Sequence, residues 1–352
     1  MKAAVYYGTG DIRVEQVAGP DAPGPGQVLL RNRFCGICGT DLHEFRHGPN
    51  IPTVVPHGLT GATMPQILGH EFSAEVLAVG EGVTTVLTGD RVAIMPLFFC
   101  GECGSCRAGR PQVCTRLGAV GYNWPWGGFG ELALVAEHQV AVLPDSVTDM
   151  QGALVEPAAV AVHAVTTAGV SPGDVVLITG GGPIGQLVAL AATAVGAGEV
   201  IVAEPSPFRR ARLESLGVAS AVDPGGVDLV ASIRARFPEG VDVAIECAGI
   251  EATINACLAS VRRGGTVLQT ALHPRPVTID PRLMTLGDIR LVGCNCFPVT
   301  SWPRVIRLIA SGQLPVERIV TGQVTIDDIV DNGFRPLLAP DGGHVKILVE
   351  AR

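Results

Sequence analysis

The stretch DVVLITGGGPIGQLVALAATAVGAGEVIVAEP, residues 174–205, contains two short apolar runs separated by a glycine turn and a segment of small residues. The runs at 174–180 and 199–205 predict buried strands, because each is short, rich in Val and Ile and bounded by turn or charged residues. The segment 182–197 predicts a helix between them. Strand, helix and strand in this order predict a βαβ unit with two parallel strands.

The same alternation of apolar strands and helices surrounds this unit. Further helices are expected at 158–169, 208–217 and 228–237, and further apolar strands at 241–249 and 266–272. Alternating strands and helices predict an α/β fold with a mostly parallel, doubly wound sheet of the Rossmann type.

The chain before residue 156 has a different texture. Short β-rich segments punctuated by Gly and Pro are found at 28–34, 71–80, 91–95 and 131–136, and the tail adds a helix at 301–314 and a strand at 346–352. We therefore expect a β-rich domain over 1–156 and 296–352, with a nucleotide-binding Rossmann domain over 157–295 inserted into it.

Length and composition exclude several classes of protein. A chain of 352 residues with 47% hydrophobic residues can form two packed domains, and its net charge of −8 argues against a nucleic-acid partner. The sequence has no secretory signal pattern and no run of about 18 apolar residues, so no membrane association is expected. Ten cysteines without an export signal favour the cytoplasm, where grouped thiols suggest metal before disulfides.

Residues Gly180 to Gly185 fit the G-x-G-x-x-G pattern, with Gly182, Pro183 and Ile184 between the outer glycines. The pattern alone is weak, but here it follows a predicted strand and opens a predicted helix. In that context small residues let the backbone approach a pyrophosphate at the positive end of the helix. The alternative is a turn that only packs a helix on a sheet.

Glu204 ends the second strand, nineteen residues after Gly185. A carboxylate there can accept hydrogen bonds from ribose hydroxyls and would repel a 2′-phosphate, so NAD is favoured over NADP. Arg209 and Arg210 follow closely, and an arginine could instead pair with that phosphate.

Four cysteines, Cys100, Cys103, Cys106 and Cys114, lie within fifteen residues. Four thiolates at this spacing can surround one zinc ion tetrahedrally, which leaves no open position for water or substrate. The cluster therefore predicts a structural zinc site. A redox or iron–sulfur site is the alternative.

A second set of residues suits catalytic zinc. Cys38, His70 and Glu156 provide one sulfur, one imidazole and one carboxylate, and three protein ligands leave a position open. A thiolate and a carboxylate also balance the charge of Zn²⁺, which favours departure of hydride from a bound alcohol. Taken singly, the three could be a buried thiol, a core histidine and a carboxylate at a helix N-terminus.

Seven motifs together resemble the zinc-dependent medium-chain alcohol dehydrogenase family over nearly the whole chain. They are the four-cysteine segment, CGICGTDLH at 35–43, GHEFSAEVLAVGEGV at 69–83, GDRVAIMP at 89–96, LVEPAAVAVHAV at 154–165, GGGPIGQ at 180–186 and HVKILV at 344–349. The resemblance implies a GroES-like catalytic domain, bound NAD, two zinc ions per subunit and a homodimer or homotetramer.

The loop at 47–71 resembles the polyol and vicinal-diol branch of this family, and most closely the 2,3-butanediol dehydrogenases. It implies interconversion of a secondary alcohol, such as 2,3-butanediol, with its ketone, acetoin. Sorbitol-, xylitol-, threonine- or formaldehyde-type enzymes of the same fold are alternatives. A non-enzymatic NAD- and zinc-binding protein is a further alternative, but it would not need the catalytic zinc set.

The resemblance also implies roles for individual residues. Thr40 matches the hydroxyl that takes the alcohol proton, and His43 matches the histidine that passes it on. Glu71 matches the carboxylate beside the zinc-binding histidine. Trp124 and Trp126 depart from the family pattern, and they are either part of the substrate pocket or ordinary packing.

Overall fold

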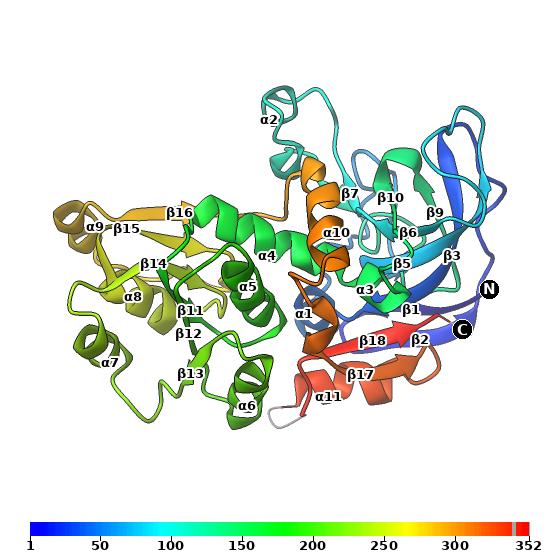
Figure 1. Cartoon of the computed structure of the whole chain (residues 1–352). Coiled ribbons are helices and arrows are strands. Elements are labelled where there is room, and N and C mark those ends of the chain that lie inside the picture. Colours follow the sequence, from blue (N-terminus) through cyan, green and yellow to red (C-terminus); the bar gives the residue numbers. More distant parts are fainter. Residues whose placement is uncertain (340–342, 352) are drawn as a thin grey trace. The chain divides into compact units, whose positions relative to one another are not determined.

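The computed structural model describes residues 1–339 and 343–351, which form two compact units (Figure 1). The first unit contains Met1–Glu156, Pro298–Gly312 and Val320–Arg352, and the second contains Pro157–Phe297 and Gln313–Ile319. The expected division assigned all of 296–352 to the β-rich domain, whereas the short segment 313–319 packs with the second unit.

A six-stranded sheet forms the centre of the second unit, in the order β13-β12-β11-β14-β15-β16. Its strands are β11 (Val175–Thr179), β12 (Glu199–Ala203), β13 (Ser220–Val222), β14 (Val241–Glu246), β15 (Val261–Gln269) and β16 (Arg290–Gly293). Every neighbouring pair is parallel. The predicted parallel, doubly wound sheet is confirmed.

Helices connect these strands. They are α4 (Val155–Ala168), α5 (Pro183–Ala194), α6 (Pro207–Leu216), α7 (Leu229–Arg236), α8 (Glu251–Ser260) and α9 (Pro281–Gly287). Ser206 and Asp228 cap α6 and α7 by accepting backbone N–H bonds, and Pro183 and Pro207 occupy first helical positions. Leu177, Ile201 and neighbouring apolar side chains are buried between sheet and helices, and this burial holds the unit together.

The first unit is built mainly from short antiparallel strands. One sheet has the order β2-β1-β4, a larger one has β10-β6-β5-β3-β18-β17 with β9 beside β3, and β7 pairs with β8. The strands are β1 (Lys2–Gly8), β2 (Asp11–Gln16), β3 (Gln27–Gly36), β4 (Gln66–Ile67), β5 (Glu71–Val79), β6 (Arg91–Ile94), β7 (Leu97–Phe98), β8 (Gly118–Ala119), β9 (Leu132–Ala136), β10 (Val140–Val142), β17 (Val320–Thr325) and β18 (Lys346–Glu350).

Short helices join these strands. They are α1 (Gly39–His47), α2 (Gly104–Arg107), α3 (Asp149–Ala153), α10 (Trp302–Ala310), α11 (Arg335–Leu338) and the π-helical turn η5 (Ile329–Phe334). The sequence did not predict α1, whose segment carries Cys38, Thr40 and His43. It forms because the Cys38 N–H donates to the Asp41 carboxylate at 2.8 Å, which satisfies one N–H at the helix start.

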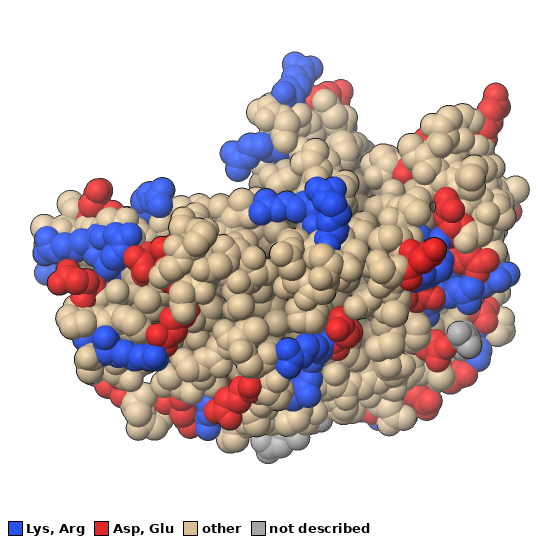
Figure 2. Space-filling view, viewed as in Figure 1, with Lys and Arg blue, Asp and Glu red and all other residues tan. Residues whose placement is uncertain are grey.

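On the face shown in Figure 2, acidic and basic side chains are interspersed, so the excess negative charge is not gathered there into one acidic patch. Among the described residues, no helix combines the length and the apolar character that crossing a bilayer requires.

Candidate zinc and cofactor sites

Backbone pairing between β3 and β5 brings two of the predicted zinc ligands together. Gly36 lies opposite Glu71 in this antiparallel pair, so the chain leaving β3 reaches Cys38 beside His70. Ligand atoms of Cys38, His70 and Glu71 all lie within 4.8 Å of one another. One sulfur, one imidazole nitrogen and one carboxylate oxygen can therefore converge on a single ion.

Glu156, the third predicted ligand, lies outside this group of three. It occupies the first turn of α4 and is 9% exposed. Burial raises the pKa of Glu156 to about 7, and the charges of His70, Glu71 and Lys346 also act on that pKa. Within the described chain, no hydrogen bond or ion pair is found for this carboxylate.

Glu71, in contrast, already has a partner. The Lys346 ammonium donates to Glu71 Oε2 and to the Ile37 carbonyl oxygen, the latter at 3.0 Å. Both side chains of the ion pair are at most 2% exposed. Lys346 lies on β18, 275 residues after Glu71, and the sequence analysis did not predict this contact.

The charges around the cluster favour an added cation. Burial lowers the pKa of His70, but Asp41 and Cys38 outweigh it and hold that pKa well above its ordinary value. Burial likewise lowers the pKa of Lys346, and the charges of Glu71 and Cys38 raise it by more. A divalent metal would compensate the acidic groups gathered here, so the donor set fits zinc in both atom type and charge.

Two of the residues expected to move protons lie on α1. The Thr40 hydroxyl is 3.7 Å from the Cys38 sulfur, at the cluster. His43 follows one helical turn later on the same face and is exposed to solvent. The helix therefore presents one hydroxyl at the cluster and one imidazole at the surface.

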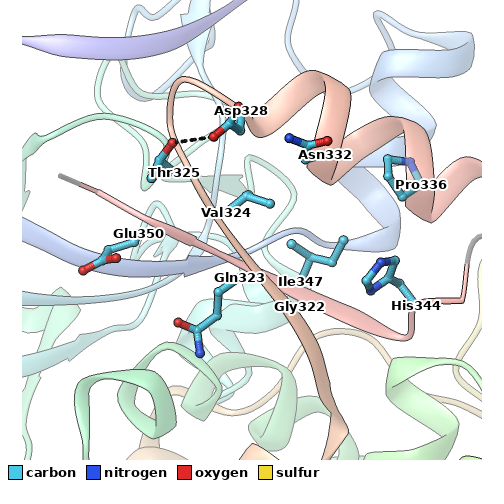
Figure 3. A pocket seen from close by; sticks show the side chains of 10 residues that line it. All are labelled: Gly322, Gln323, Val324, Thr325, Asp328, Asn332, Pro336, His344, Ile347 and Glu350. Atoms are coloured by element: carbon cyan, nitrogen blue, oxygen red, sulfur yellow. Dashed lines mark hydrogen bonds between the residues drawn. The ribbon is translucent and has the colours of Figure 1, made fainter.

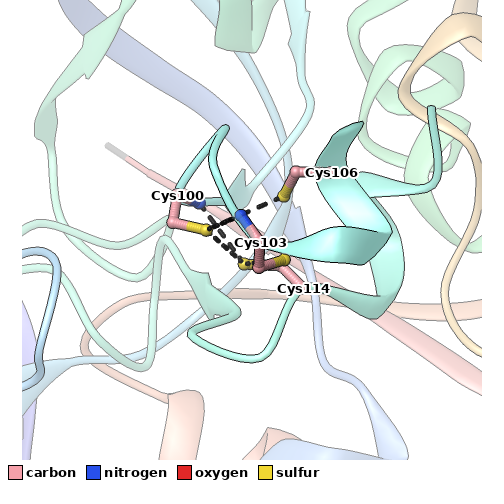
Figure 4. Close-up of side chains that lie close together, drawn as sticks. All are labelled: Cys100, Cys103, Cys106 and Cys114. Atoms are coloured by element: carbon pink, nitrogen blue, oxygen red, sulfur yellow. Dashed lines mark hydrogen bonds between the residues drawn. The ribbon is translucent and has the colours of Figure 1, made fainter. Parts of the chain in front are cut away.

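The four-cysteine lobe, residues 100–114, brings its four sulfurs together (Figure 4). The Sγ atoms are 3.9 Å apart for Cys100 and Cys106, 3.9 Å for Cys103 and Cys114, and 3.4 Å for Cys114 and Cys100. All four cysteines are free of disulfides. The separations suit tetrahedral thiolate ligation of one ion.

Backbone N–H groups around the lobe favour the thiolate form that zinc binds. The N–H of Cys100 donates to Cys114 Sγ, and the N–H of Cys103 donates to Cys100 Sγ, each at 3.3 Å. The N–H groups of Cys106 and Thr115 lower the pKa of Cys103. Burial and the neighbouring Cys103 thiol raise the pKa of Cys106 to about 12, so these groups favour the thiolate at Cys103 but not at Cys106.

Trp124 and Trp126 are half-buried and pack against the core of the first unit. Their rings meet edge to face with centroids 5.9 Å apart, and Trp124 also contacts Phe98. The Trp124 indole N–H donates to the Leu134 carbonyl oxygen at 2.6 Å. These contacts favour the packing role for both tryptophans over a place in the substrate pocket.

The glycine turn of the second unit has the close approaches that require glycine. Gly180 has a positive φ of 95°, and a Cβ at Gly185 would lie 1.8 Å from the Gly180 carbonyl oxygen. Gly182 starts α5 without any side-chain cap. Pro183 and Ile184 begin the helix, whose first N–H groups are left available to a pyrophosphate.

Glu204 lies at the end of β12 beside this turn and is 3% exposed. Its Oε2 accepts the Gly181 N–H at 2.7 Å, and its Oε1 accepts the Ser206 N–H at 2.8 Å. Arg209 Nη1 is 3.9 Å from Glu204 Oε2, whereas Arg210 binds the backbone carbonyl oxygen of Glu204. A carboxylate and one arginine are thus both close to the expected ribose position.

A separate cavity of about 470 Å³ lies in the first unit between β17, β18 and the turn η5 (Figure 3). Polar side chains dominate its wall, among them Gln323, Asp328, Asn332 and His344. None of the predicted zinc or cofactor residues lines it.

Comparison with known proteins identifies the family. Residues 24–145 match the alcohol dehydrogenase GroES-like domain, and residues 183–311 match the zinc-binding dehydrogenase family. The (R,R)-butanediol dehydrogenase of Bacillus subtilis is 37% identical to this chain, and the alignment covers 99% of both chains.

Solved structures agree with this result. The crystal structure of 2R,3R-butanediol dehydrogenase from Bacillus subtilis matches with a TM-score of 0.93 and 36% identity, covering 100% of this chain and 99% of that one. A putative zinc-binding dehydrogenase from Sinorhizobium meliloti, bound to NADP, matches with a TM-score of 0.90 and 33% identity, covering 99% and 98%. The predicted combination of a GroES-like and a Rossmann-type domain is confirmed, and the chain is an oxidoreductase belonging to the zinc-dependent medium-chain alcohol dehydrogenase family.

Proposed function

We propose that this chain interconverts a vicinal diol, 2,3-butanediol, and its ketone acetoin, with NAD as the hydride acceptor. The first unit would hold the alcohol and a catalytic zinc ion, and the second unit would hold the cofactor. The observation that carries this proposal is the convergence of Cys38, His70 and Glu71 in a buried, acidic cluster. The similarity to butanediol dehydrogenases supports the diol as substrate.

The proposed ligands of the catalytic zinc are Cys38, His70 and Glu156. Glu71 lies closer to the other two, but its carboxylate is already paired with Lys346. Among the described residues, Glu156 is buried without a hydrogen bond or ion pair, and a buried carboxylate is costly until a cation compensates it. Ligation of the metal by Glu156 would therefore be favourable, while Glu71 stays with Lys346.

Substitution of Glu156 and of Glu71 should have different effects. We expect Glu156→Gln to weaken binding of the catalytic zinc at least about 100-fold, because it removes a charged ligand. The Glu71→Gln change should instead leave Lys346 buried without a counter-charge and reduce the free energy of unfolding by about 3–5 kcal/mol. Zinc retained per chain after dialysis against a chelator and thermal unfolding of each variant would measure both effects. If Glu71→Gln lost the zinc and Glu156→Gln kept it, the two roles would be exchanged.

Bound zinc would act as a Lewis acid that lowers the pKa of the substrate hydroxyl. Thr40, at the cluster, would accept the hydroxyl proton as it passes its own proton on, and exposed His43 would release the relayed proton to solvent. Bound NAD would supply the hydride acceptor, so that one alcohol and one NAD would yield one ketone, one NADH and one proton. A diol offers a second oxygen on the adjacent carbon for binding.

A substrate panel tests the proposal directly. It would compare the isomers of 2,3-butanediol with sorbitol, xylitol, threonine and simple secondary alcohols, each with NAD and with NADP. We expect the highest kcat/KM for one butanediol isomer with NAD. A higher value for a polyol or for threonine would move the chain to the corresponding branch of the family, and lack of turnover with every alcohol would exclude the proposed function.

The proposed cofactor site consists of the turn from Gly180 to Gly185, Glu204 and Arg209. Glu204 is positioned by the Gly181 and Ser206 N–H groups, and its remaining lone pairs can accept ribose hydroxyls. Because its negative charge would repel a 2′-phosphate, NAD is proposed over NADP.

Replacement of Glu204 by Ser should lower the ratio of kcat/KM with NAD to kcat/KM with NADP by about 10- to 100-fold, the usual effect of losing a hydrogen bond to a charged group. Steady-state kinetics with both cofactors would measure it. This ratio of the two kcat/KM values distinguishes a change in cofactor selectivity from general damage to the turn, because damage would lower kcat/KM with both cofactors alike. The matched variant Arg209→Ala should shift the ratio in the opposite direction, and an unchanged ratio in both variants would contradict the assignment.

We propose that two copies pair through the outer edge of β16, which pairs with no further strand among the described residues. Leu291 on this edge strand is 39% exposed, and Leu286 on the preceding helix α9 is 72% exposed. An unpaired strand edge with apolar side chains is a surface that a second copy can cover. Light scattering should then give the mass of a dimer or tetramer, and a monomer would contradict this pairing.

Ten free cysteines suit a reducing compartment, so the cytoplasm is the proposed location, which cell fractionation would test.

A further inference from the structure

One buried tyrosine contacts the candidate zinc site without belonging to its ligands. The Tyr122 hydroxyl donates to Asp41 Oδ1 at 2.9 Å, and the tyrosine ring packs on the His70 ring with centroids 4.8 Å apart. Tyr122 is 4% exposed and Asp41 is fully buried. Neither side chain is therefore available to a substrate.

Asp41 connects the tyrosine to both zinc ligands. Its Oδ2 accepts the Cys38 N–H at 2.8 Å, which fixes the backbone that carries the thiol. Its Oδ1 faces His70 Nδ1 at 3.6 Å, and that nitrogen has no other partner among the described residues. With Nδ1 directed at Asp41, the opposite ring nitrogen, Nε2, is the one left for a metal.

The segment that carries Tyr122 is itself held in place. The neighbouring Asn123 is 5% exposed, and its Nδ2 donates to the Ile51 carbonyl oxygen at 3.2 Å. Asn123 Oδ1 accepts the Ala119 N–H at 3.2 Å, and the Thr60 hydroxyl donates to the Asn123 carbonyl oxygen. The tyrosine hydroxyl thus reaches Asp41 from a segment that is held through the next residue, Asn123.

We propose that Tyr122 is a positioning residue for the catalytic zinc: its hydroxyl fixes the rotamer of Asp41, and its ring limits rotation of the His70 imidazole. This inference rests on the proposed zinc site at Cys38, His70 and Glu156. Tyr122 touches neither substrate nor metal, and it acts by holding the histidine in the orientation that ligation requires. The effect should therefore be strongest on metal binding and weaker on binding of the alcohol.

The test compares Tyr122→Phe with the matched variant Tyr6→Phe. Tyr6 is buried as well, and its hydroxyl donates to the Glu44 carbonyl oxygen at 2.8 Å, which belongs to none of the proposed zinc ligands. We expect the Tyr122→Phe enzyme to release its catalytic zinc to a chelator about tenfold faster than wild type, since changes to groups that orient a metal ligand cost about 10- to 100-fold in affinity or activity. The Tyr6→Phe enzyme should release it at the wild-type rate.

Three measurements separate the outcomes. Zinc at the four-cysteine lobe provides an internal reference, because its release should be unchanged in both variants. The cobalt-substituted Tyr122→Phe enzyme should show an altered visible spectrum, and its kcat should fall more than its KM changes. Tyr122→Leu, which also removes the ring, should release zinc faster still. If wild type held only one zinc per chain, the proposed function would fail; if it held two and Tyr122→Phe matched Tyr6→Phe in release and spectrum, the positioning role alone would fail.

Discussion

Replacement of Cys38 by Ser is expected to lower the rate of NADH formation from 2,3-butanediol at least about 1000-fold, because zinc catalysis needs the thiolate ligand. A serine hydroxyl is neutral near pH 7, so the variant loses both a soft ligand and a negative charge. The remaining proposed ligands, His70 and one carboxylate, should bind zinc too weakly to hold it through dialysis. Metal analysis should then give one zinc per chain in place of two.

The fold should survive this substitution, because Cys38 is only half-buried and its backbone N–H bond to Asp41 does not involve the thiol. Circular dichroism and thermal unfolding would confirm that. The control is Cys35→Ala, which removes a fully buried thiol three residues earlier that lies outside the ligand group. Full activity in the Cys38→Ser enzyme, or an equal loss in the control, would overturn the assignment of the catalytic metal site.

Local sequence patterns were sufficient to predict the second unit. One continuous segment forms the strand from 175 to 179, the turn at Gly180 to Gly185 and α5. Residues close together in the sequence form each of these elements, so its hydrophobic or glycine pattern can be recognised in the sequence. The four-cysteine lobe was predictable for the same reason, because all four thiols lie within fifteen residues. In both cases the spacing along the chain determines the geometry.

The environment of the candidate catalytic site was less predictable, because it depends on contacts between distant segments. Lys346 pairs with Glu71 across 275 residues, and Tyr122 reaches Asp41 across 81. Residue types at Cys38 and His70 indicate a metal, but they do not reveal which acid is already neutralised. A buried lysine in an apolar strand and an aspartate inside the CGTDLH motif were the available signals.

The helix α1 was missed for a related reason. Its segment is short and polar, with no apolar stripe, so periodicity gave no signal. The hydrogen bond from the Cys38 N–H to Asp41 starts the helix and also fixes the position of the thiol. The same aspartate therefore determines local structure and helps to form the site, which a search for ligand types alone does not detect.

Replacement of Cys103 by Ser is expected to remove the second zinc and to disorder the four-cysteine lobe while the rest of the first unit stays folded. The lobe contains only a four-residue helix, α2, and a 3₁₀ turn, and few of its side chains are buried, so little besides the metal orders it. Its exposed Arg107 is a trypsin site that should be cleaved at least about tenfold faster once the lobe opens, whereas the bond after Arg110 precedes Pro111 and resists trypsin.

Limited proteolysis followed by mass spectrometry would locate the cut, and metal analysis would show which zinc is lost. The Cys35→Ala variant again serves as the control, since it removes a buried thiol without affecting the lobe. Zinc at the Cys38 site should remain in the Cys103→Ser enzyme, because the two groups of ligands share no residue. If the variant kept both ions and resisted trypsin like the control, the four sulfurs would not be holding a structural metal, and another interaction would have to order residues 100–114.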